Sequence, residues 1–222
     1  MYMWRMLFPE YCHICGDDLT QGERFVCSPC LASLRRTDYH LLPLNPMEEK
    51  LAGGPQFIRA TGFFFYERCG SVSTLIQDMK YRSFPSIGEI LGGVMARALK
   101  DSGFFEGIDL LQPVPMNRWK EWDRGYNQAE SVARGVSAET GIAICDNLRA
   151  RRRHGSQTHL GVAEREANMR DYFKSYHPEE IEGRHLLIID DVCTTGATLR
   201  NCAAPLSQIP GVSISYLTLA TT

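Results

Sequence analysis

Apolar residues follow two alternating patterns from about residue 58 to the end of the 222-residue chain. Short continuous apolar runs predict strands, and they cover residues 58–66, 109–114, 141–144, 186–189 and 212–219. Apolar residues spaced three and four apart predict helices, and they cover residues 72–79, 87–98, 126–136 and 197–206. Strands that alternate with helices form parallel sheets with right-handed crossovers. The pattern therefore predicts an α/β domain, with a parallel sheet flanked by helices.

The chain before residue 58 has a different character. Residues 1–36 begin with a short apolar stretch, which predicts a helix, and continue into a cysteine-rich ribbon. Residues 37–57 are rich in Pro, Gly and Asn, which predicts a linker. The expected organisation is a small N-terminal unit (1–36), a linker (37–57) and one α/β domain (58–222).

Four cysteines of the N-terminal unit form two closely spaced pairs, Cys12 with Cys15 and Cys27 with Cys30. Two such pairs can place four thiolates around one tetrahedral Zn²⁺ at roughly 2.3 Å. Four thiolates leave no open position for a catalytic water, so we predict a structural zinc site. His13, inside the first pair, is not expected to bind the metal. A redox C-x-x-C motif is the alternative, but it requires a thioredoxin-like βαβ context that this segment lacks.

Polar residues follow the apolar strand at 186–189 directly. An acidic pair comes first and a hydroxyl-rich loop second: Asp190 and Asp191, then Thr194, Thr195, Gly196, Ala197 and Thr198. Ligands of open α/β sheets bind beyond the carboxyl ends of strands, and a loop that leads into a helix binds phosphate through its N–H groups. The carboxylates suit sugar hydroxyls or a hydrated Mg²⁺. We predict a sugar-phosphate site here, with a structural turn as the alternative. Because successive strand residues point to opposite faces, both carboxylates can reach one ribose only if the strand ends near Asp190.

Composition and missing motifs narrow the possible functions. The chain has 24 Lys and Arg against 26 Asp and Glu, a net charge of −2, which excludes a histone-like polycation and an acidic disordered chain. It contains no G-x-x-x-x-G-K-[ST], no G-x-G-x-x-G after a strand and no H-E-x-x-H, so a P-loop nucleotide hydrolase is not expected. The longest apolar runs are far shorter than the roughly 20 residues that cross a bilayer. The N-terminus does not have the pattern of a secretory signal. A soluble, cytoplasmic protein is expected.

Residues 188–199, IIDDVCTTGATL, resemble the phosphoribosyl pyrophosphate (PRPP) signature of type I phosphoribosyltransferases. Together with the four-cysteine ribbon, the whole chain resembles the ComF family of competence proteins, which are implicated in DNA uptake during natural transformation. Further segments similar to the family are MKYR at 79–82, PVP at 113–115, RGYNQA at 124–129 and QTHL at 157–160. The segment WKEWD at 119–123 departs from the more basic run expected there.

This resemblance implies a type I phosphoribosyltransferase-like fold and a role for each motif. Asp190 and Asp191 would contact the ribose hydroxyls and Mg²⁺, and the loop from Thr194 to Thr198 would hold the 5′-phosphate of PRPP. The candidate cations for the diphosphate are Lys80, Arg118 and Arg124. The expected function is DNA uptake together with other competence proteins, with a PRPP pocket. The alternative is an active phosphoribosyltransferase that transfers ribose-5-phosphate to a nitrogen acceptor.

A basic cluster follows residue 148, and it consists of Arg149, Arg151, Arg152, Arg153 and His154. Such a patch can bind the phosphates of single-stranded DNA, and nearby Trp and Tyr residues can stack on unpaired bases. In type I phosphoribosyltransferases a mobile loop over the active site occupies a similar part of the chain, so closure over PRPP is a second interpretation. A solvated loop is the third.

Overall fold

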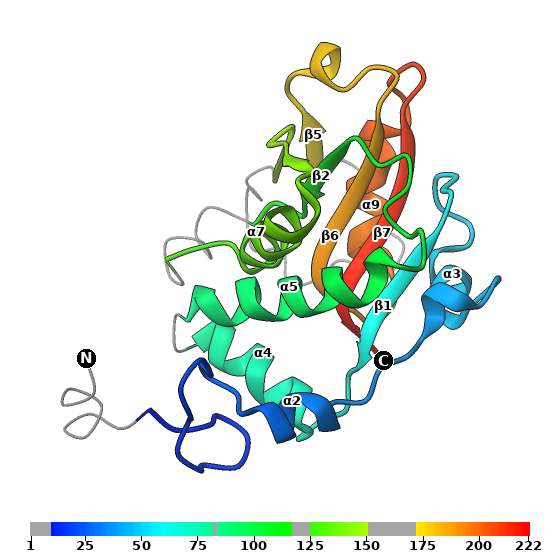
Figure 1. Ribbon diagram of the computed structural model, residues 1–222. Helices are drawn as coiled ribbons and strands as arrows, with labels where there is room; N and C mark the ends of the chain where they lie inside the picture. The colour runs from blue at the N-terminus through cyan, green and yellow to red at the C-terminus, as the bar shows by residue number, and fades with distance from the viewer. Residues whose placement is uncertain (1–9, 82–83, 117–124, 151–171) are drawn as a thin grey trace, which may run out of the picture.

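Five parallel strands form the central sheet of the computed structural model, which describes residues 10–81, 84–116, 125–150 and 172–222. Their order across the sheet is β1-β7-β6-β2-β3 (Figure 1). The strands are β1 (Ala60–Phe65), β2 (Leu110–Pro113), β3 (Ala143–Ile144), β6 (His185–Cys193) and β7 (Ser213–Thr221). Every neighbouring pair is parallel. The predicted α/β fold, a parallel sheet flanked by helices, is confirmed.

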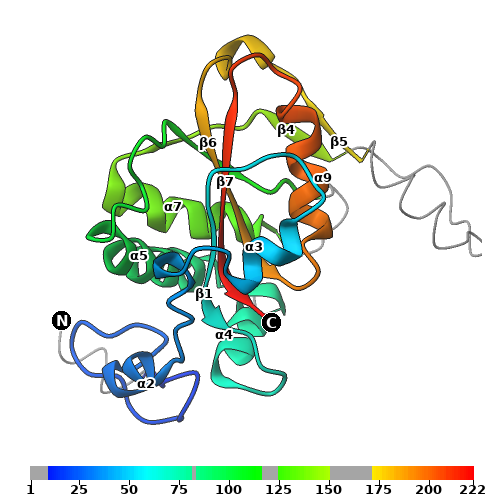
Figure 2. The ribbon, with the colours of Figure 1, turned by 90° about the vertical axis from the view of Figure 1, so that its right-hand side faces the viewer.

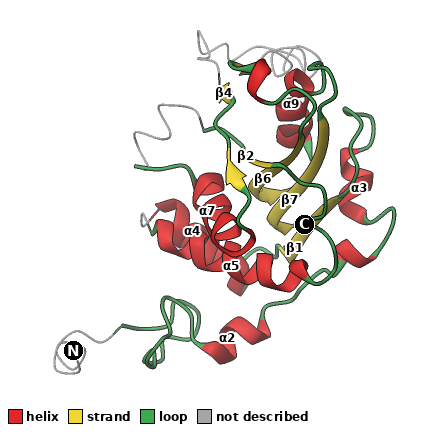
Figure 3. Cartoon of the chain, turned by 45° about the horizontal axis from the view of Figure 1, so that its top comes forward, coloured by secondary structure: helices red, strands yellow, loops and turns green. Residues whose placement is uncertain are grey.

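Helices cover both faces of this sheet (Figures 2 and 3). They are α3 (Pro46–Leu51), α4 (Ser71–Tyr81), α5 (Pro85–Lys100), α7 (Gln128–Thr140) and α9 (Ala197–Leu206). Strand β6 shows why a helix layer is needed on each face of the sheet, because its apolar side chains point to the two faces in turn. Leu187 and Ile189 join the core with α4, α5 and α7, whereas Leu186 and Ile188 join the core with α3 and α9. Among the described residues, no helix is long and apolar enough to cross a membrane.

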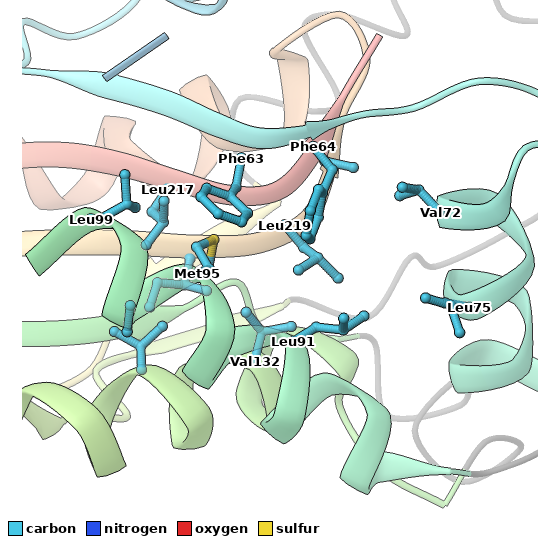
Figure 4. Packing of buried hydrophobic residues seen from close by; sticks show 14 of the residues in the cluster. Phe63, Phe64, Val72, Leu75, Leu91, Met95, Leu99, Val132, Leu217 and Leu219 are labelled. Atoms are coloured by element: carbon cyan, nitrogen blue, oxygen red, sulfur yellow. The ribbon is translucent and has the colours of Figure 1, made fainter. Parts of the chain in front are cut away.

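The larger core lies between the sheet and the layer of α4, α5 and α7 (Figure 4). Helices α5 and α7 approach each other through glycines. A Cβ added to Gly92 would lie 2.3 Å from the Val132 carbonyl oxygen, and one added to Gly135 would lie 2.0 Å from the Glu89 carbonyl oxygen. This close packing fixes α7, whose N-terminal end reaches the candidate site described below.

The N-terminal cysteine unit packs onto the α/β domain. Helix α2 (Ser28–Ser33) contains Cys30 and follows the other three cysteines of the unit, and Cys12, Cys27 and Leu34 belong to the same buried cluster as Phe64 of β1. The apolar helix predicted at the start of residues 1–36 lies outside the described residues. The cysteine unit and the α/β domain therefore share one apolar core.

The segment predicted to be a linker, residues 37–57, contains the 3-10 helix η1 (Tyr39–Leu41) and the helix α3. Oδ1 of Asn45 caps α3 by accepting hydrogen bonds from the next N–H groups, and its Nδ2 donates to the Ala60 carbonyl at 2.9 Å. Met47 and Leu51 are buried in the core that also contains α9. These residues add a layer to the folded domain, and the domain boundaries themselves stay a prediction.

A second, two-stranded sheet is not predicted by the sequence pattern. It pairs β4 (Leu148–Ala150) with β5 (Phe173–Ser175) in antiparallel fashion, and the 3-10 helix η2 (Pro178–Glu180) follows. Strands of three residues are too short to show a period of two. The side chain of Asn147, just before β4, ties the two segments together by donating to the His177 carbonyl.

Candidate functional site

A cavity opens where the chain connections change direction across the sheet. From β2 the chain continues outward to β3, whereas from β6 it continues to β7 on the opposite side. Open α/β sheets bind ligands at such a switch point, beyond the carboxyl ends of the strands. The cavity has a volume of about 240 Å³ and is lined by Val114 and Met116 after β2 and by Asp190 and Asp191 of β6. The acidic pair lies where the topology favours a ligand.

Asp190 and Asp191 both line this cavity, although β6 continues past them to Cys193. The structure does not meet the condition stated from the sequence, a strand that ends near Asp190, and the two residues line the same cavity nonetheless. Strand β2 pairs with β6 only as far as Pro113, opposite Ile189, so β6 continues beyond it with no strand partner on that side among the described residues. Each carboxylate accepts a hydrogen bond from the N–H of the following residue, at 2.9 Å for Asp190 and 2.8 Å for Asp191. Because no described strand pairs with β6 on this side after Ile189, the side chains of Asp190 and Asp191 can both face the cavity.

Lys80, at the end of α4, is brought to the acidic pair by the fold. Its Nζ lies 2.6 Å from Oδ2 of Asp191, and the two side chains are only 24% and 14% exposed. Burial, followed by the negative charge of Asp191, raises the pKa of Asp190 well above its usual value, while the Lys80 charge acts in the opposite direction. One ammonium group and two closely spaced carboxylates thus share the cavity wall.

The loop from Thr194 to Thr198 forms the N-terminal end of α9. Gly196 is the N-cap residue with a φ of +73°, and Thr198 lines the cavity. The Arg200 guanidinium donates to the carbonyl groups of Lys50 in α3 and of Thr195, the latter at 3.1 Å, and so ties the loop to α3. The hydroxyl groups of Thr194 and Thr195 belong to exposed residues. The first N–H groups of a helix have no partner within the helix, so this end suits an anion.

The opposite wall comes from residues to which the sequence alone assigns no part in this cavity. Asn127 caps α7 and donates from Nδ2 to the Val114 carbonyl at 2.9 Å, which connects α7 to the end of β2. Tyr172 and Phe173 line the cavity from the side of β5. The hydroxyl of Tyr126 donates to the Met79 carbonyl, and stacking of the Tyr126 ring on bases stays a prediction. Asn127 and Tyr126 lie in the RGYNQA segment, which was the available sequence signal.

The four cysteines predicted to bind zinc gather in one cluster. Their sulfur atoms all lie within 4.8 Å of one another, and those of Cys15 and Cys27 are 3.8 Å apart. A tetrahedron with zinc–sulfur bonds of roughly 2.3 Å has edges of roughly 3.8 Å, so the cluster fits the ion. Burial opposes ionisation of Cys12, but backbone N–H groups of its neighbours bond to its sulfur and lower its pKa to about 6. The cluster is compatible with structural zinc.

Several predicted residues lie outside the described part of the chain. They are two of the three candidate diphosphate cations, Arg118 and Arg124, and the three candidate nucleic-acid residues, Arg151, Arg152 and Arg153. The structure thus places Lys80, the acidic pair and the Thr194–Thr198 loop around the switch point. The roles predicted for all these residues stay predictions.

Curated proteins match the chain along most of its length. The DNA utilization protein YhgH of Escherichia coli is 25% identical over 227 residues, which cover 96% of this chain and 98% of that protein. The competence protein ComFC of Bacillus subtilis is 23% identical over 240 residues, which cover 97% of this chain and 88% of that protein. The chain is a relative of the ComF and YhgH proteins. The predicted resemblance is confirmed.

Other comparisons of this ComF relative are less extensive. The competence protein F of Haemophilus influenzae is 29% identical over 143 residues, and the match covers 62% of this chain and 62% of that protein, less than two thirds of its length. No family model matches. Among solved structures, the allosteric regulatory enzyme of purine biosynthesis superposes with a TM-score of 0.40 and 20% identity, over 59% of this chain and 26% of that one.

Proposed function

We propose that this ComF relative takes part in DNA uptake and that its cavity binds PRPP together with Mg²⁺. The observation that carries the PRPP proposal is the meeting of three chemical groups at the switch point. These are the two carboxylates, the ammonium group of Lys80 and the hydroxyl-rich loop that ends at Thr198. The role in DNA uptake is supported by the relatives, which are named competence and DNA utilization proteins.

Each group suits one part of PRPP. The ribose hydroxyls donate hydrogen bonds, and the carboxylates of Asp190 and Asp191 accept them. The 5′-phosphate suits the N-terminal end of α9, where backbone N–H groups and threonine hydroxyls donate. Lys80 is the described cation that lines the cavity, and it suits the diphosphate.

The oxygen donors on the cavity wall fit Mg²⁺. This ion takes oxygen ligands and is usually held by one or two carboxylates, by waters and by the phosphates of the ligand. Asp190 and Asp191 supply carboxylates, and PRPP supplies phosphate oxygens. When bound, the ion would offset the charge of the diphosphate.

We assign the cysteine cluster to a structural Zn²⁺. Four thiolates this close to one another need a cation between them to offset their repulsion. All four positions around the ion would be filled by cysteine sulfur, so the ion would hold the N-terminal unit together and would leave no place for a catalytic water.

Calorimetric titration of the zinc-loaded protein with PRPP, with and without Mg²⁺, tests the cavity. We expect magnesium-dependent binding that Asp190→Asn abolishes without changing zinc content or folding. The matched control is Asp101→Asn, which changes an exposed carboxylate at the C-terminal end of α5. Retained PRPP affinity in Asp190→Asn, or no binding to the unchanged protein at millimolar PRPP, would contradict the proposal. Release of diphosphate when a nitrogen acceptor is added would identify the alternative, an active phosphoribosyltransferase.

Single-stranded DNA binding is a second function that the names of the relatives favour. The predicted contacts are Arg151, Arg152 and Arg153, which follow directly after β4. Changing all three to Ala should reduce the slope of log affinity against log salt by about 2, since each phosphate contact on a single strand contributes about 0.7. A control with the same loss of charge replaces Arg97, Lys100 and Arg134, all exposed on α5 and α7. An unchanged slope in the first variant would remove this interpretation of the cluster.

A further inference from the structure

The C-terminal part of α4 joins the N-terminal cysteine unit to the cavity. Nδ1 of His13 lies 2.6 Å from Oδ2 of Asp78, and the two side chains are 16% and 9% exposed. Two residues further along the same helix, Lys80 makes its contact with Asp191. Figure 1 shows the cysteine unit beside α4, on the side away from β2. A hydrogen-bonded helix segment moves as one body, so the position of Asp78 influences the position of Lys80.

His13 is held firmly on the side of the cysteine unit. Its ring lies edge-on to Phe25 of that unit and to Phe84 at the start of α5, with a distance of 5.4 Å between ring centres in each case. Its main-chain N–H donates to the Phe25 carbonyl at 2.7 Å. In sequence, His13 lies between Cys12 and Cys15 of the sulfur cluster. The geometry of that cluster therefore determines where the imidazole meets α4.

The last turn of α4 has a second attachment on the side of α7. The hydroxyl of Tyr126 donates to the carbonyl of Met79, and the Met79 side chain is fully buried. Asp78, Met79 and Lys80 are consecutive, and each contacts a different part of the molecule. The attachment to His13 is thus one of the contacts that set the place of Lys80 relative to the acidic pair.

We propose that His13 and Asp78 are positioning residues for Lys80, so that the cysteine unit contributes to ligand binding without touching the ligand. This inference rests on the PRPP site proposed above. Without the contact to His13, the end of α4 loses one of its links to the cysteine unit, and Lys80 shifts relative to Asp191. Weakening the charge-assisted contact between Lys80 and the diphosphate by about 1.4 kcal/mol corresponds to a factor of ten in affinity. We therefore expect loss of the His13–Asp78 contact to reduce PRPP affinity about tenfold.

A double-mutant cycle distinguishes positioning from a general structural role. PRPP affinity with Mg²⁺ is measured for the unchanged protein, for Asp78→Ala, for Lys80→Met and for the combined variant. We expect Asp78→Ala, which removes the partner of His13, to weaken binding about tenfold when Lys80 is present and to have no further effect when Lys80 is Met. A structural role would weaken binding equally in both backgrounds. Zinc content and the thermal midpoint are recorded for each protein.

Two further variants keep the test decisive. His13→Phe removes the same hydrogen bond from the other side while keeping an aromatic ring between Phe25 and Phe84, so it serves if Asp78→Ala does not fold. Glu67→Gln is the matched control. Glu67 lies just before α4, and the change removes its exposed ion pair with Arg35, which does not involve Lys80. We expect it to leave PRPP affinity unchanged.

The possible failures are distinguishable. If Asp78→Ala and His13→Phe bind PRPP as well as the unchanged protein does, or if the losses are equal in both backgrounds, the positioning role is wrong and the PRPP site stands. If the unchanged protein does not bind PRPP, the proposed function is wrong and this inference is wrong with it.

Discussion

Replacement of Gly196 by Ala tests how closely the loop before α9 is packed. Gly196 has a φ of +73°, and an L residue in this region costs about 1–2 kcal/mol. The added Cβ would also lie 2.8 Å from the Lys50 carbonyl oxygen and 3.1 Å from a methyl carbon of Leu51. That carbonyl is backbone and accepts from Arg200, so it does not move freely. Overpacking of this kind adds about 1–3 kcal/mol. We expect the free energy of unfolding to fall by about 3 kcal/mol in total.

Gly141→Ala provides the matched control. Gly141 caps the C-terminal end of α7 with a φ of +76°, but a Cβ there would meet nothing within 4 Å. Its loss should be about 1–2 kcal/mol, the backbone cost alone. Urea unfolding at 25 °C measures both variants, and the difference between them isolates the contact with α3. PRPP titration should show weaker binding for Gly196→Ala only. Equal destabilisation by the two variants would refute the reasoning.

Three further changes test the charges and the cysteine cluster. We expect the free energy of unfolding to decline as the pH rises from about 4 through the raised pKa of Asp190, since the native state holds this proton more tightly than the unfolded state does. Asp190→Asn removes the titrating group, so this decline should disappear. Urea unfolding between pH 4 and 8 measures this, and an unchanged pH profile would contradict it. Lys80→Met leaves Asp191 without its ion pair and should lower stability by about 2 kcal/mol, as measured by urea unfolding at pH 7. A loss below about 0.5 kcal/mol, the usual size for a surface substitution, would show that the ion pair does not stabilise the fold. Cys12→Ser should release zinc and lower the thermal midpoint of the whole chain in one transition, because Cys12 shares its core with the sheet. The control Cys69→Ser changes an exposed cysteine and should alter neither the zinc content nor the thermal midpoint. Calorimetry and zinc analysis measure both, and two separate transitions would show that the cysteine unit unfolds independently.

The sheet could be predicted from the sequence because its strands are strongly apolar and separated by regular helical spacing. Strand β6 is the clearest case, since a run that is apolar on both faces requires cover on both sides. The β4–β5 pair could not be found, because each strand has three residues and its partner is distant in the sequence. Helix α3 lies in a segment rich in Pro and Gly, but Asn45 followed by Pro46 and Glu48 is a helix start signal that was available.

The candidate site shows the same division between local pattern and tertiary contact. The acidic pair and the threonine loop are consecutive in the sequence, so their chemistry is visible before any fold is known. The meeting of Lys80 with Asp191 depends on how α4 packs beside β6, and no local pattern encodes that distance. The contact of His13 with Asp78 could not be predicted either, because the two residues lie 65 positions apart on different elements.

The charges on the cavity wall argue for a cation in the bound state. Among the described lining residues, the carboxylates of Asp190 and Asp191 face the single ammonium group of Lys80. Burial and the neighbouring Asp191 carboxylate raise the pKa of Asp190, so a second negative charge on this wall is unfavourable. A phosphoribosyl ligand would bring more negative charge to the same wall, and Mg²⁺ between carboxylate and phosphate would relieve that repulsion. Protonation of Asp190 would also lower the charge, but it would remove the carboxylate that the ion needs. PRPP affinity in the presence of Mg²⁺ should therefore fall as the pH falls through the pKa of Asp190, and Asp190→Asn should lose binding at every pH. An affinity that rises toward low pH would contradict this role of the carboxylate.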